Sequence, residues 1–344
     1  MQEVLTDLRR WLEDGKRAAL GTVVKVWGSA PRQSGSKLVV SSAGDISGSV
    51  SNGCVEGAVI EEAREVMQSG TPRLLHFGVT NEEAWAVGLT CGGEIEVLVE
   101  PVVDDEAWQQ LVRSIEAEEP VVTARFLGKS DGVRQLVVRP DGSTAGSLGS
   151  EHMDAAATSR GQELLADMTS VRTVVEAGGE SADLFFDVTA PQPRLVLIGA
   201  GHVAIPLVAM ANAMGFHTIV VDPRTAFAAP ERFRHADELI PEWPQEALAR
   251  VPITQNTCVA VLSHDLKLDV PALEIVLRSP ARYVGALGSK RTHAKRIAAL
   301  EEKGLSDGEI ARIHAPIGLD LGGRKPEEIA LSILAQIVAD GHGK

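Results

Sequence analysis

A glycine-rich motif, Gly199-Ala200-Gly201-His202-Val203-Ala204, is the part of this sequence best suited to bind a ligand. It follows the apolar run Leu195–Ile198 and matches the pattern GxGxxA of a strand-to-helix turn. In such a turn Gly199 lets the chain reverse, Gly201 lets a phosphate approach the backbone, and the helix start offers unpaired N–H groups. Asp222 ends the next apolar run, where its carboxylate would accept a hydrogen bond from a ribose hydroxyl. The motif predicts a Rossmann-like fold, and it leaves open whether a dinucleotide binds or the glycines serve packing alone.

Three residues near this motif carry further expectations. If a dinucleotide binds, the acid at Asp222 favours NAD, because it would repel the 2′-phosphate of NADP. Arg224 could hold a phosphate or form an ordinary surface salt bridge. Pro206 lies just past the first turn of a helix capped by Gly201, so we expect it to cost a backbone hydrogen bond and to distort the helix.

Two further polar clusters follow predicted strands of the same half of the chain. Ser263-His264-Asp265 follows VAVL at the carboxyl edge of the predicted sheet. There His264 could be an acid, a base or a metal ligand, or Asp265 could simply cap the next helix. Gly288-Ser289-Lys290-Arg291 follows YVGAL, and it could bind an anion at a helix start or form a solvated basic helix face.

The first half of the chain contains small-residue loops and two of the three cysteines. The loops at residues 28–32 and 49–56 could present backbone N–H groups to an anion. Cys54, Cys91 and Cys258 lack close ligand spacing, so neither a disulfide framework nor a thiolate zinc site is supported. Glycines beside Cys91 could leave its sulfur accessible, although on chemistry alone a buried, inert thiol is the safer interpretation.

Strand and helix patterns divide the chain into two domains. From residue 194 onward apolar strands alternate with helices, which predicts an α/β fold with a Rossmann-like, doubly wound parallel sheet. Residues 1–190 predict an α+β domain, in which residues 104–190 form a middle extension, and no internal repeat is visible. The segment APQPR carries two prolines in five residues, so we place the boundary near Pro193, between domains 1–190 and 191–344.

The composition excludes several classes of protein. The 344 residues include 33 Lys and Arg against 47 Asp and Glu, which gives a formal charge of −14, and 5 Trp, 1 Tyr and 7 Phe. An acidic chain with few aromatic stacking platforms is a poor partner for nucleic acid. The first twenty residues scatter charges among apolar positions, as no signal peptide or membrane-spanning helix does, so we predict a cytoplasmic protein. A homodimer is the expectation for a soluble oligomer.

Several segments in this order resemble the XdhC/CoxI family of accessory proteins for xanthine dehydrogenase and carbon monoxide dehydrogenase. The amino-terminal family domain is similar to GSAPRQSGSKLVV, SGSVSNGCVEGAV and GLTCGGEIEV. The Rossmann-like carboxy-terminal domain is similar to IGAGHVA, VVDPR, SHDLKLD, YVGALGSKRTHAKR and PIGLDLGGRKPEEIALSILAQIV.

The resemblance implies an accessory protein that acts as a maturation factor rather than as an enzyme. It would bind the molybdenum cofactor, a pterin with a phosphate tail, support its sulfuration, and insert it into a xanthine dehydrogenase-type molybdenum hydroxylase. A cysteine desulfurase would be the partner that supplies sulfur. By the same resemblance, Cys54 and Cys91 match cysteines of the family motifs and become candidates for cofactor or sulfur handling.

Two other functions stay open beside this chaperone. An NAD-dependent oxidoreductase would use Asp222 for the ribose and His264 or Cys91 near the nicotinamide, and an interaction scaffold would leave the Rossmann site empty. We predict the following cofactor-binding residues: Gly199, Gly201, His202, Asp222, His264, Ser289, Lys290, Arg291, Cys54 and Cys91.

Overall fold

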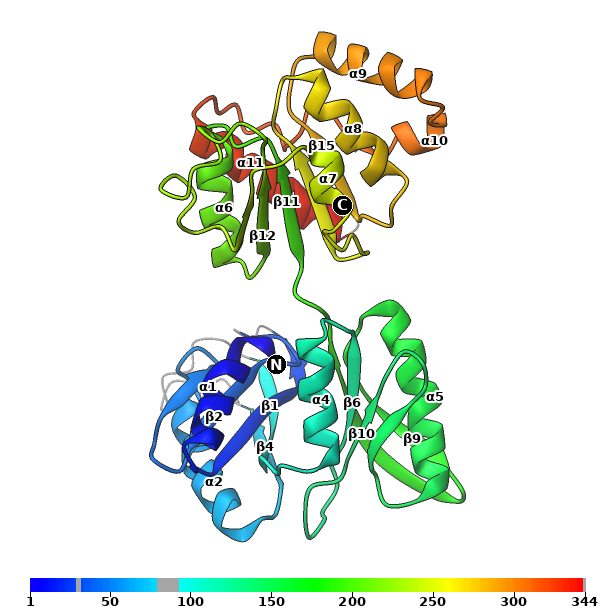
Figure 1. Cartoon of the computed structure of the whole chain (residues 1–344). Coiled ribbons are helices and arrows are strands. Elements are labelled where there is room, and N and C mark those ends of the chain that lie inside the picture. Colours follow the sequence, from blue (N-terminus) through cyan, green and yellow to red (C-terminus); the bar gives the residue numbers. More distant parts are fainter. Residues whose placement is uncertain (29–31, 79–92, 343–344) are drawn as a thin grey trace. The chain divides into compact units, whose positions relative to one another are not determined.

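The computed structural model of the chain describes residues 1–28, 32–78 and 93–342. The chain divides into two compact units, Met1–Pro191 (unit 1) and Gln192–Lys344 (unit 2). In Figure 1 unit 1 is coloured from blue to green and unit 2 from green to red. Among the helices of the described residues, none combines the length and the apolar character needed to span a membrane.

Unit 2 is a six-stranded parallel sheet with helices on both faces (Figure 1). Its strand order is β13-β12-β11-β14-β15-β16, and every neighbouring pair is parallel. Numbered along the chain, this is the order 3-2-1-4-5-6 of the Rossmann fold, so the predicted doubly wound sheet is confirmed. The elements are β11 (Arg194–Ile198), α6 (Ala204–Ala213), β12 (His217–Val221), β13 (Glu238–Ile240), α7 (Pro244–Leu248), β14 (Thr257–Val261), α8 (Leu266–Leu277), β15 (Tyr283–Ala286), α9 (Lys290–Glu302), α10 (Asp307–Ile310), β16 (Ile313–His314) and α11 (Pro326–Gly341).

The side chains of the central strand β11 contribute to two apolar cores, one on each face of the sheet of unit 2. Leu195 and Leu197 pack with residues of α6 and α11, whereas Val196 and Ile198 pack with residues of α8. A strand buried on both faces has a continuous apolar sequence, which is why this alternation of strands and helices could be predicted. The short elements β13, α7, α10 and β16 have no such run and were not predicted.

Unit 1 contains two five-stranded antiparallel sheets, each built from one half of the unit. The first half contains α1 (Gln2–Glu13), β1 (Ala18–Trp27), β2 (Lys37–Ser41), β3 (Ile46–Gly48), α2 (Glu56–Ser69), β4 (Arg73–Phe77) and β5 (Glu94–Pro101). The second contains α4 (Glu106–Glu116), β6 (Val121–Phe126), β7 (Gln135–Val138), β8 (Thr144–Ser147), α5 (Glu151–Asp167), β9 (Val171–Ala177) and β10 (Glu180–Thr189). The sheet orders, β3-β2-β1-β5-β4 and β8-β7-β6-β10-β9, are the same arrangement used twice.

The two halves of unit 1 are therefore a structural repeat. Leu38 pairs with Gly48 in the first sheet as Leu136 pairs with Gly146 in the second. Both glycines have positive φ, 80° and 85°, and at both a Cβ would collide with a backbone carbonyl oxygen of the facing strand. The sequence shows no such repeat, because matched positions share geometry and burial while most residue identities differ.

Two buried ion pairs join the halves of unit 1. The Lys37 Nζ lies 2.6 Å from Asp187 Oδ2, and Arg125 pairs with Glu100. Glu100 and Asp187 occupy matched positions of β5 and β10, so each half supplies one acid to a cation of the other. A small apolar cluster also spans the halves, because Val24 and Leu98 pack with Leu127 and Phe185. The halves thus form one core.

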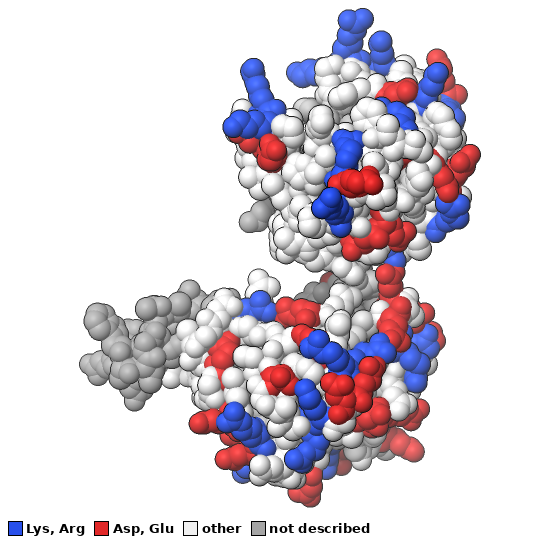
Figure 2. Space-filling model, turned by 60° about the vertical axis from the view of Figure 1, so that its left-hand side comes forward, with Lys and Arg blue, Asp and Glu red and all other residues white. Residues whose placement is uncertain are grey.

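The surface of unit 1 carries both signs of charge. In the view of Figure 2, Lys and Arg side chains are interspersed with Asp and Glu side chains over unit 1.

Candidate functional site

The glycine motif lies where the strand order of unit 2 reverses. Gly199 follows β11 and Ser263 follows β14, and these two strands are neighbours whose following helices cover opposite faces. Gly199 has a φ of 105°, and a Cβ on it would lie 2.9 Å from the backbone nitrogen of Ser263. Only glycine permits this approach. Because ligands of open α/β sheets bind at such a switch point, the candidate site lies at the carboxyl ends of β11 and β14.

The backbone at Gly201 is open to a ligand. No atom lies within 4 Å of the position that a Cβ on Gly201 would take, and the neighbouring His202 is exposed. The helix α6 begins at Ala204, with Val203 as its N-cap, and no side chain caps it. This arrangement leaves the positive end of the helix dipole to an anion.

The expectation for Pro206 was wrong. The helix α6 begins at Ala204, later than a cap at Gly201 implied, so Pro206 is the third helical residue. The first four N–H groups of a helix have no intrahelical acceptor, so the missing N–H of Pro206 costs no hydrogen bond.

The Asp222 carboxylate is fully used within the protein. Its side chain has no exposed surface and accepts hydrogen bonds from the Ala200 N–H (2.8 Å) and the Arg224 N–H (2.9 Å). The Arg224 guanidinium adds two more bonds at 2.8 and 2.6 Å. Burial alone would raise the pKa of Asp222, but these donors outweigh it and hold the pKa below its usual value. Asp222 therefore fixes the glycine loop against the end of β12.

Arg224 takes the salt-bridge role that was one of its two predicted roles. Besides binding Asp222, its guanidinium stacks over the Phe227 ring, 4.4 Å from the ring centre. A phosphate at this place would have to compete with both contacts.

A buried cluster that the sequence analysis missed supports the same edge of the sheet. Arg296 and Asp269 have no exposed surface, and the Arg296 Nε lies 2.7 Å from Asp269 Oδ2. The Ser263 hydroxyl donates to the other oxygen of Asp269. Arg296 also donates to the carbonyl oxygens of Ser263 (3.1 Å) and Leu287 (2.8 Å). It therefore ties the ends of β14 and β15 to α8 and α9.

A signal for this cluster existed in the sequence. Asp269 lies between Leu268 and Val270 on the apolar side of its helix, and Arg296 lies four residues before the buried Leu300. An acid and a base on inward helix positions indicate a buried pair.

The loop between β15 and α9 keeps two cations available. Ser289 accepts a hydrogen bond from the Thr292 N–H at 3.2 Å and caps α9, and its hydroxyl also lies 3.1 Å from the Thr292 hydroxyl oxygen, so it is already engaged within the helix. Lys290 and Arg291 are exposed, and neither forms an ion pair with another described residue. The predicted anion site here stays a prediction.

The cap interpretation of the Ser263-His264-Asp265 cluster is confirmed for Asp265. Its carboxylate accepts a hydrogen bond from the Lys267 N–H at 2.9 Å and caps α8. His264 is exposed at the same edge. Its predicted role in cofactor binding stays a prediction.

In unit 1 the loop before α2 is held by one carboxylate. Glu56 accepts hydrogen bonds from the Ser49 hydroxyl (2.7 Å) and from the backbone N–H groups of Val50, Ser51 and Gly53 (3.2, 2.8 and 2.8 Å). Burial opposes ionisation, but these bonds lower the pKa of Glu56 to about 2. The expectation that this loop offers its N–H groups to an anion was wrong, because Glu56 already occupies them.

The cysteines differ in access. Cys54 is exposed on this loop, while Cys258 is buried in β14, where burial raises the pKa of its thiol. Cys91 lies outside the described residues.

Comparison with known families identifies both ends of the chain. Residues 11–78 match the family described as "XdhC and CoxI family", and residues 195–337 match the "XdhC Rossmann domain". The chain belongs to the XdhC/CoxI family. The resemblance seen in its sequence motifs is thereby confirmed.

Two curated relatives of this XdhC/CoxI protein match over nearly the whole chain. A probable xanthine dehydrogenase subunit of Bacillus subtilis (strain 168) is 28% identical over 97% of this chain and 96% of its own length. The "Molybdenum cofactor insertion chaperone PaoD" of Escherichia coli (strain K12) is 29% identical over 95% of this chain and 85% of its own length. A crystal structure described as a xanthine dehydrogenase from Bacillus halodurans is 26% identical, with a TM-score of 0.79 over 99% of this chain and 96% of that one.

The XdhC/CoxI segments of unit 1 are joined in the fold. The Arg32 Nε, from GSAPRQSGSK, donates to the Ser49 carbonyl oxygen at 3.2 Å, in SGSVSNGCVEGAV. Arg32 and Ser49, which belong to two motifs that are separate in the sequence, thus lie in contact in unit 1.

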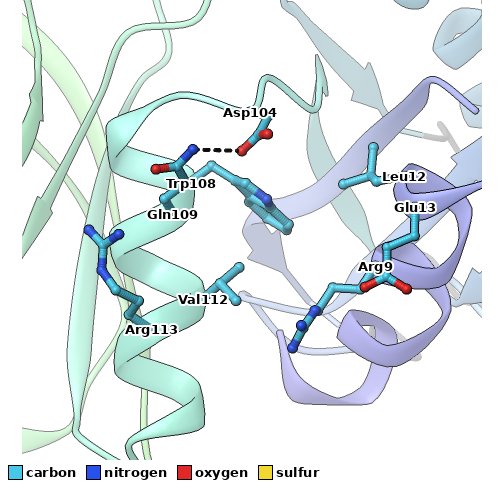
Figure 3. Close-up of a pocket in the computed structure, with 8 residues that line it drawn as sticks. All are labelled: Arg9, Leu12, Glu13, Asp104, Trp108, Gln109, Val112 and Arg113. Atoms are coloured by element: carbon cyan, nitrogen blue, oxygen red, sulfur yellow. Dashed lines mark hydrogen bonds between the residues drawn. The ribbon is translucent and has the colours of Figure 1, made fainter. Parts of the chain in front are cut away.

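A cavity of about 560 Å³ lies between the helices α1 and α4 of unit 1 (Figure 3). The side chains of Leu12 and Trp108 face the space between the helices, and Gln109 donates a hydrogen bond to Asp104 at 3.3 Å. This groove has mainly apolar walls with charges at its edge, so it lacks the converging polar groups that a pterin needs.

Metal-binding side chains are not grouped in the described parts of the XdhC/CoxI chain. No set of three or more His, Cys, Asp and Glu side chains there is arranged to hold an ion.

Proposed function

We propose that this protein is a maturation chaperone that binds the molybdenum cofactor and inserts it into a xanthine dehydrogenase-type molybdenum hydroxylase. Two relatives, an insertion chaperone for this cofactor and a probable component of a xanthine dehydrogenase, support this role. The observation in the fold that carries the proposal is the open backbone at Gly201, beside an uncapped helix start. The cofactor is cargo here, and its chemistry belongs to the client enzyme.

The residues at the switch point fit the phosphate tail of this cargo. The backbone beside Gly201 has room for an anion, and the start of α6 attracts one through its dipole. Lys290 and Arg291 are exposed cations without ion pairs among the described residues. A negatively charged ligand is therefore the chemistry that this edge suits best.

The NAD-dependent alternative loses its main support. Asp222 has no exposed surface and both carboxylate oxygens are bonded, so a ribose hydroxyl would have to displace the Arg224 guanidinium. Breaking that charge-assisted pair opposes NAD binding.

The test of this proposal is whether the molybdenum cofactor is recovered with the purified protein. The protein is expressed anaerobically in a host that makes the cofactor, purified, oxidised and assayed for the fluorescent pterin, with NAD calorimetry on the same batch. Pterin near one per chain without NAD uptake is expected. NAD uptake without pterin would contradict the chaperone role.

The sulfuration role is a finer part of the same proposal. Cys54 is exposed, and by resemblance to the family motifs Cys54 and Cys91 are the candidates for handling sulfur that a cysteine desulfurase supplies. We expect Cys54→Ser and Cys91→Ser to keep the fold intact and to lower client activity. Full client activity with both variants would remove the cysteines from the function. We further propose a cytoplasmic homodimer, and light scattering checks its oligomeric state.

A further inference from the structure

The second large cavity of unit 1, of about 440 Å³, is polar and lies on a family motif. Its walls include Arg32, Ser34 and Ser36 from the loop between β1 and β2, together with Ser170 and Asp187 from the other half of the unit. The volume of this cavity falls in the range of small-molecule sites, which begins at about 300 Å³.

A free acceptor and a free donor converge in this cavity. Asp187 is 5% exposed, its Oδ2 accepts from Lys37 at 2.6 Å, and within the described part of the chain its Oδ1 accepts nothing. The Ser170 oxygen accepts the Val188 N–H at 3.0 Å, which leaves the hydroxyl proton to donate. A Cβ placed on Gly35 would lie 3.7 Å from Asp187 Oδ1 and 4.0 Å from Ser170 Oγ, so both atoms flank the same point.

The repeat supplies an internal comparison for this cavity. The matched place in the other half, at Glu100 and Pro101, holds a cavity of only about 10 Å³. There Val133 occupies the position that Gly35 has two residues before the strand, and Arg125 lines the space. At matched positions of the repeat, side chains therefore fill the space beside Glu100, whereas the space beside Asp187 stays open.

Asp187 is ionised, which makes it a strong hydrogen-bond acceptor. Burial would raise the pKa of this carboxyl, but Lys37 and Arg125 outweigh that effect and lower its pKa. The carboxylate therefore stays ionised at neutral pH and accepts strong, charge-assisted hydrogen bonds.

We infer that this cavity of unit 1 binds the pterin ring of the cofactor by its 2-amino-4-oxo edge, with Asp187 Oδ1 accepting from ring N–H groups and the Ser170 hydroxyl donating to the ring oxygen. A ring N–H that donates to the ionised Oδ1 forms a charge-assisted hydrogen bond, which is stronger than one between neutral groups. The inference rests on the proposed function and concerns unit 1 alone.

The test titrates the full chain with 6-hydroxymethylpterin, a fluorescent ring without metal or phosphate. The variant Lys37→Met/Asp187→Asn removes both charges of the pair together, so no buried charge is left alone. We expect its affinity to fall at least about tenfold, in line with the loss of a charge-assisted hydrogen bond. The control Arg160→Met/Glu163→Gln makes the same exchange at an exposed ion pair of unit 1, outside the cavity, and should keep the affinity.

A second variant controls for misfolding, and a second ligand tests the role of the 2-amino group. Ser36→Trp fills the cavity without touching a buried charge, and it should also abolish binding. The ligand 6-hydroxymethyllumazine, with an oxygen in place of the 2-amino group, should bind at least about tenfold more weakly. Equal affinities for both ligands, or equal affinities of wild type and Ser36→Trp, would overturn the inference.

Recovery of natural cofactor separates this inference from the proposed function. Cofactor bound equally by wild type and by both cavity variants would keep the chaperone role and overturn the pterin site. Hydroxymethylpterin binding that the variants lose, with no cofactor recovered from wild type, would support the site and contradict the chaperone role.

Discussion

At the scale of single residues, Gly201 offers the cleanest test of the crevice. Gly201→Val places a branched side chain into space where no atom lies within 4 Å, so the fold should tolerate it. We expect the phosphate approach to be blocked and cofactor recovery to fall at least about tenfold, with a stability change within about 1 kcal/mol. Pterin content and urea unfolding measure the two effects.

The control for this change is Gly132→Val in unit 1. Gly132 also has nothing within 4 Å of a Cβ, but it lies in the loop between β6 and β7. It should keep cofactor recovery. Unchanged recovery with Gly201→Val would move the phosphate away from this loop.

Glu56 gives a prediction with a defined pH dependence. Its pKa in the folded state is about 2, against 4.5 for an ordinary glutamate, so its stabilisation is present above pH 4.5 and is lost as the pH falls toward 2. Glu56→Gln should therefore be less stable than wild type at pH 7, by about 1 kcal/mol after allowance for solvent screening. Urea unfolding from pH 7 to pH 3 should show this difference shrinking.

Glu61→Gln on the exposed face of the same helix is the control and should follow wild type at every pH. A difference between Glu56→Gln and wild type that stays constant with pH would show that the loop is held by something other than the ionised carboxylate.

At the scale of elements, Arg296 connects α9 to α8 and to the carboxyl ends of β14 and β15 in unit 2. Arg296→Met leaves Asp269 buried without its cation and removes the bonds to the ends of β14 and β15. We expect the free energy of unfolding to fall by about 3–5 kcal/mol. Urea denaturation measures the loss.

The double variant Arg296→Met/Asp269→Leu removes both charges and should recover most of that stability. Arg278→Met, which breaks an exposed pair with Glu274, should cost less than about 1 kcal/mol. If the double variant were as unstable as the single one, the unpaired acid would not be the cause.

The predicted elements differed in how well their sequences revealed them. The strands β11, β12, β14 and β15 are buried apolar runs and were recognised as strands. Boundaries were less accurate where the loop decides them, as at α6, which begins at Ala204.

At the scale of the whole molecule, each unit has apolar clusters of its own. The two largest clusters of unit 2 contain no residue of unit 1. We expect residues 192–344 expressed alone to unfold in one cooperative transition, at the urea midpoint that this unit shows in the full chain. Circular dichroism with urea measures this. A broad, non-cooperative transition would mean that unit 2 depends on unit 1 for its stability.

The Rossmann-like class, the glycine motif and the family can all be recognised in the sequence, because they depend on local hydrophobic periodicity, turn chemistry and the order of short motifs. Tertiary structure alone decided three further features. Asp222 became a support for the glycine loop because Arg224 reaches its carboxylate. Glu56 took the N–H groups of its own loop. The repeat of unit 1, with the ion pairs Lys37–Asp187 and Arg125–Glu100 that its two halves share, stayed hidden because packing constrains the burial and size of matched residues and leaves their identity free.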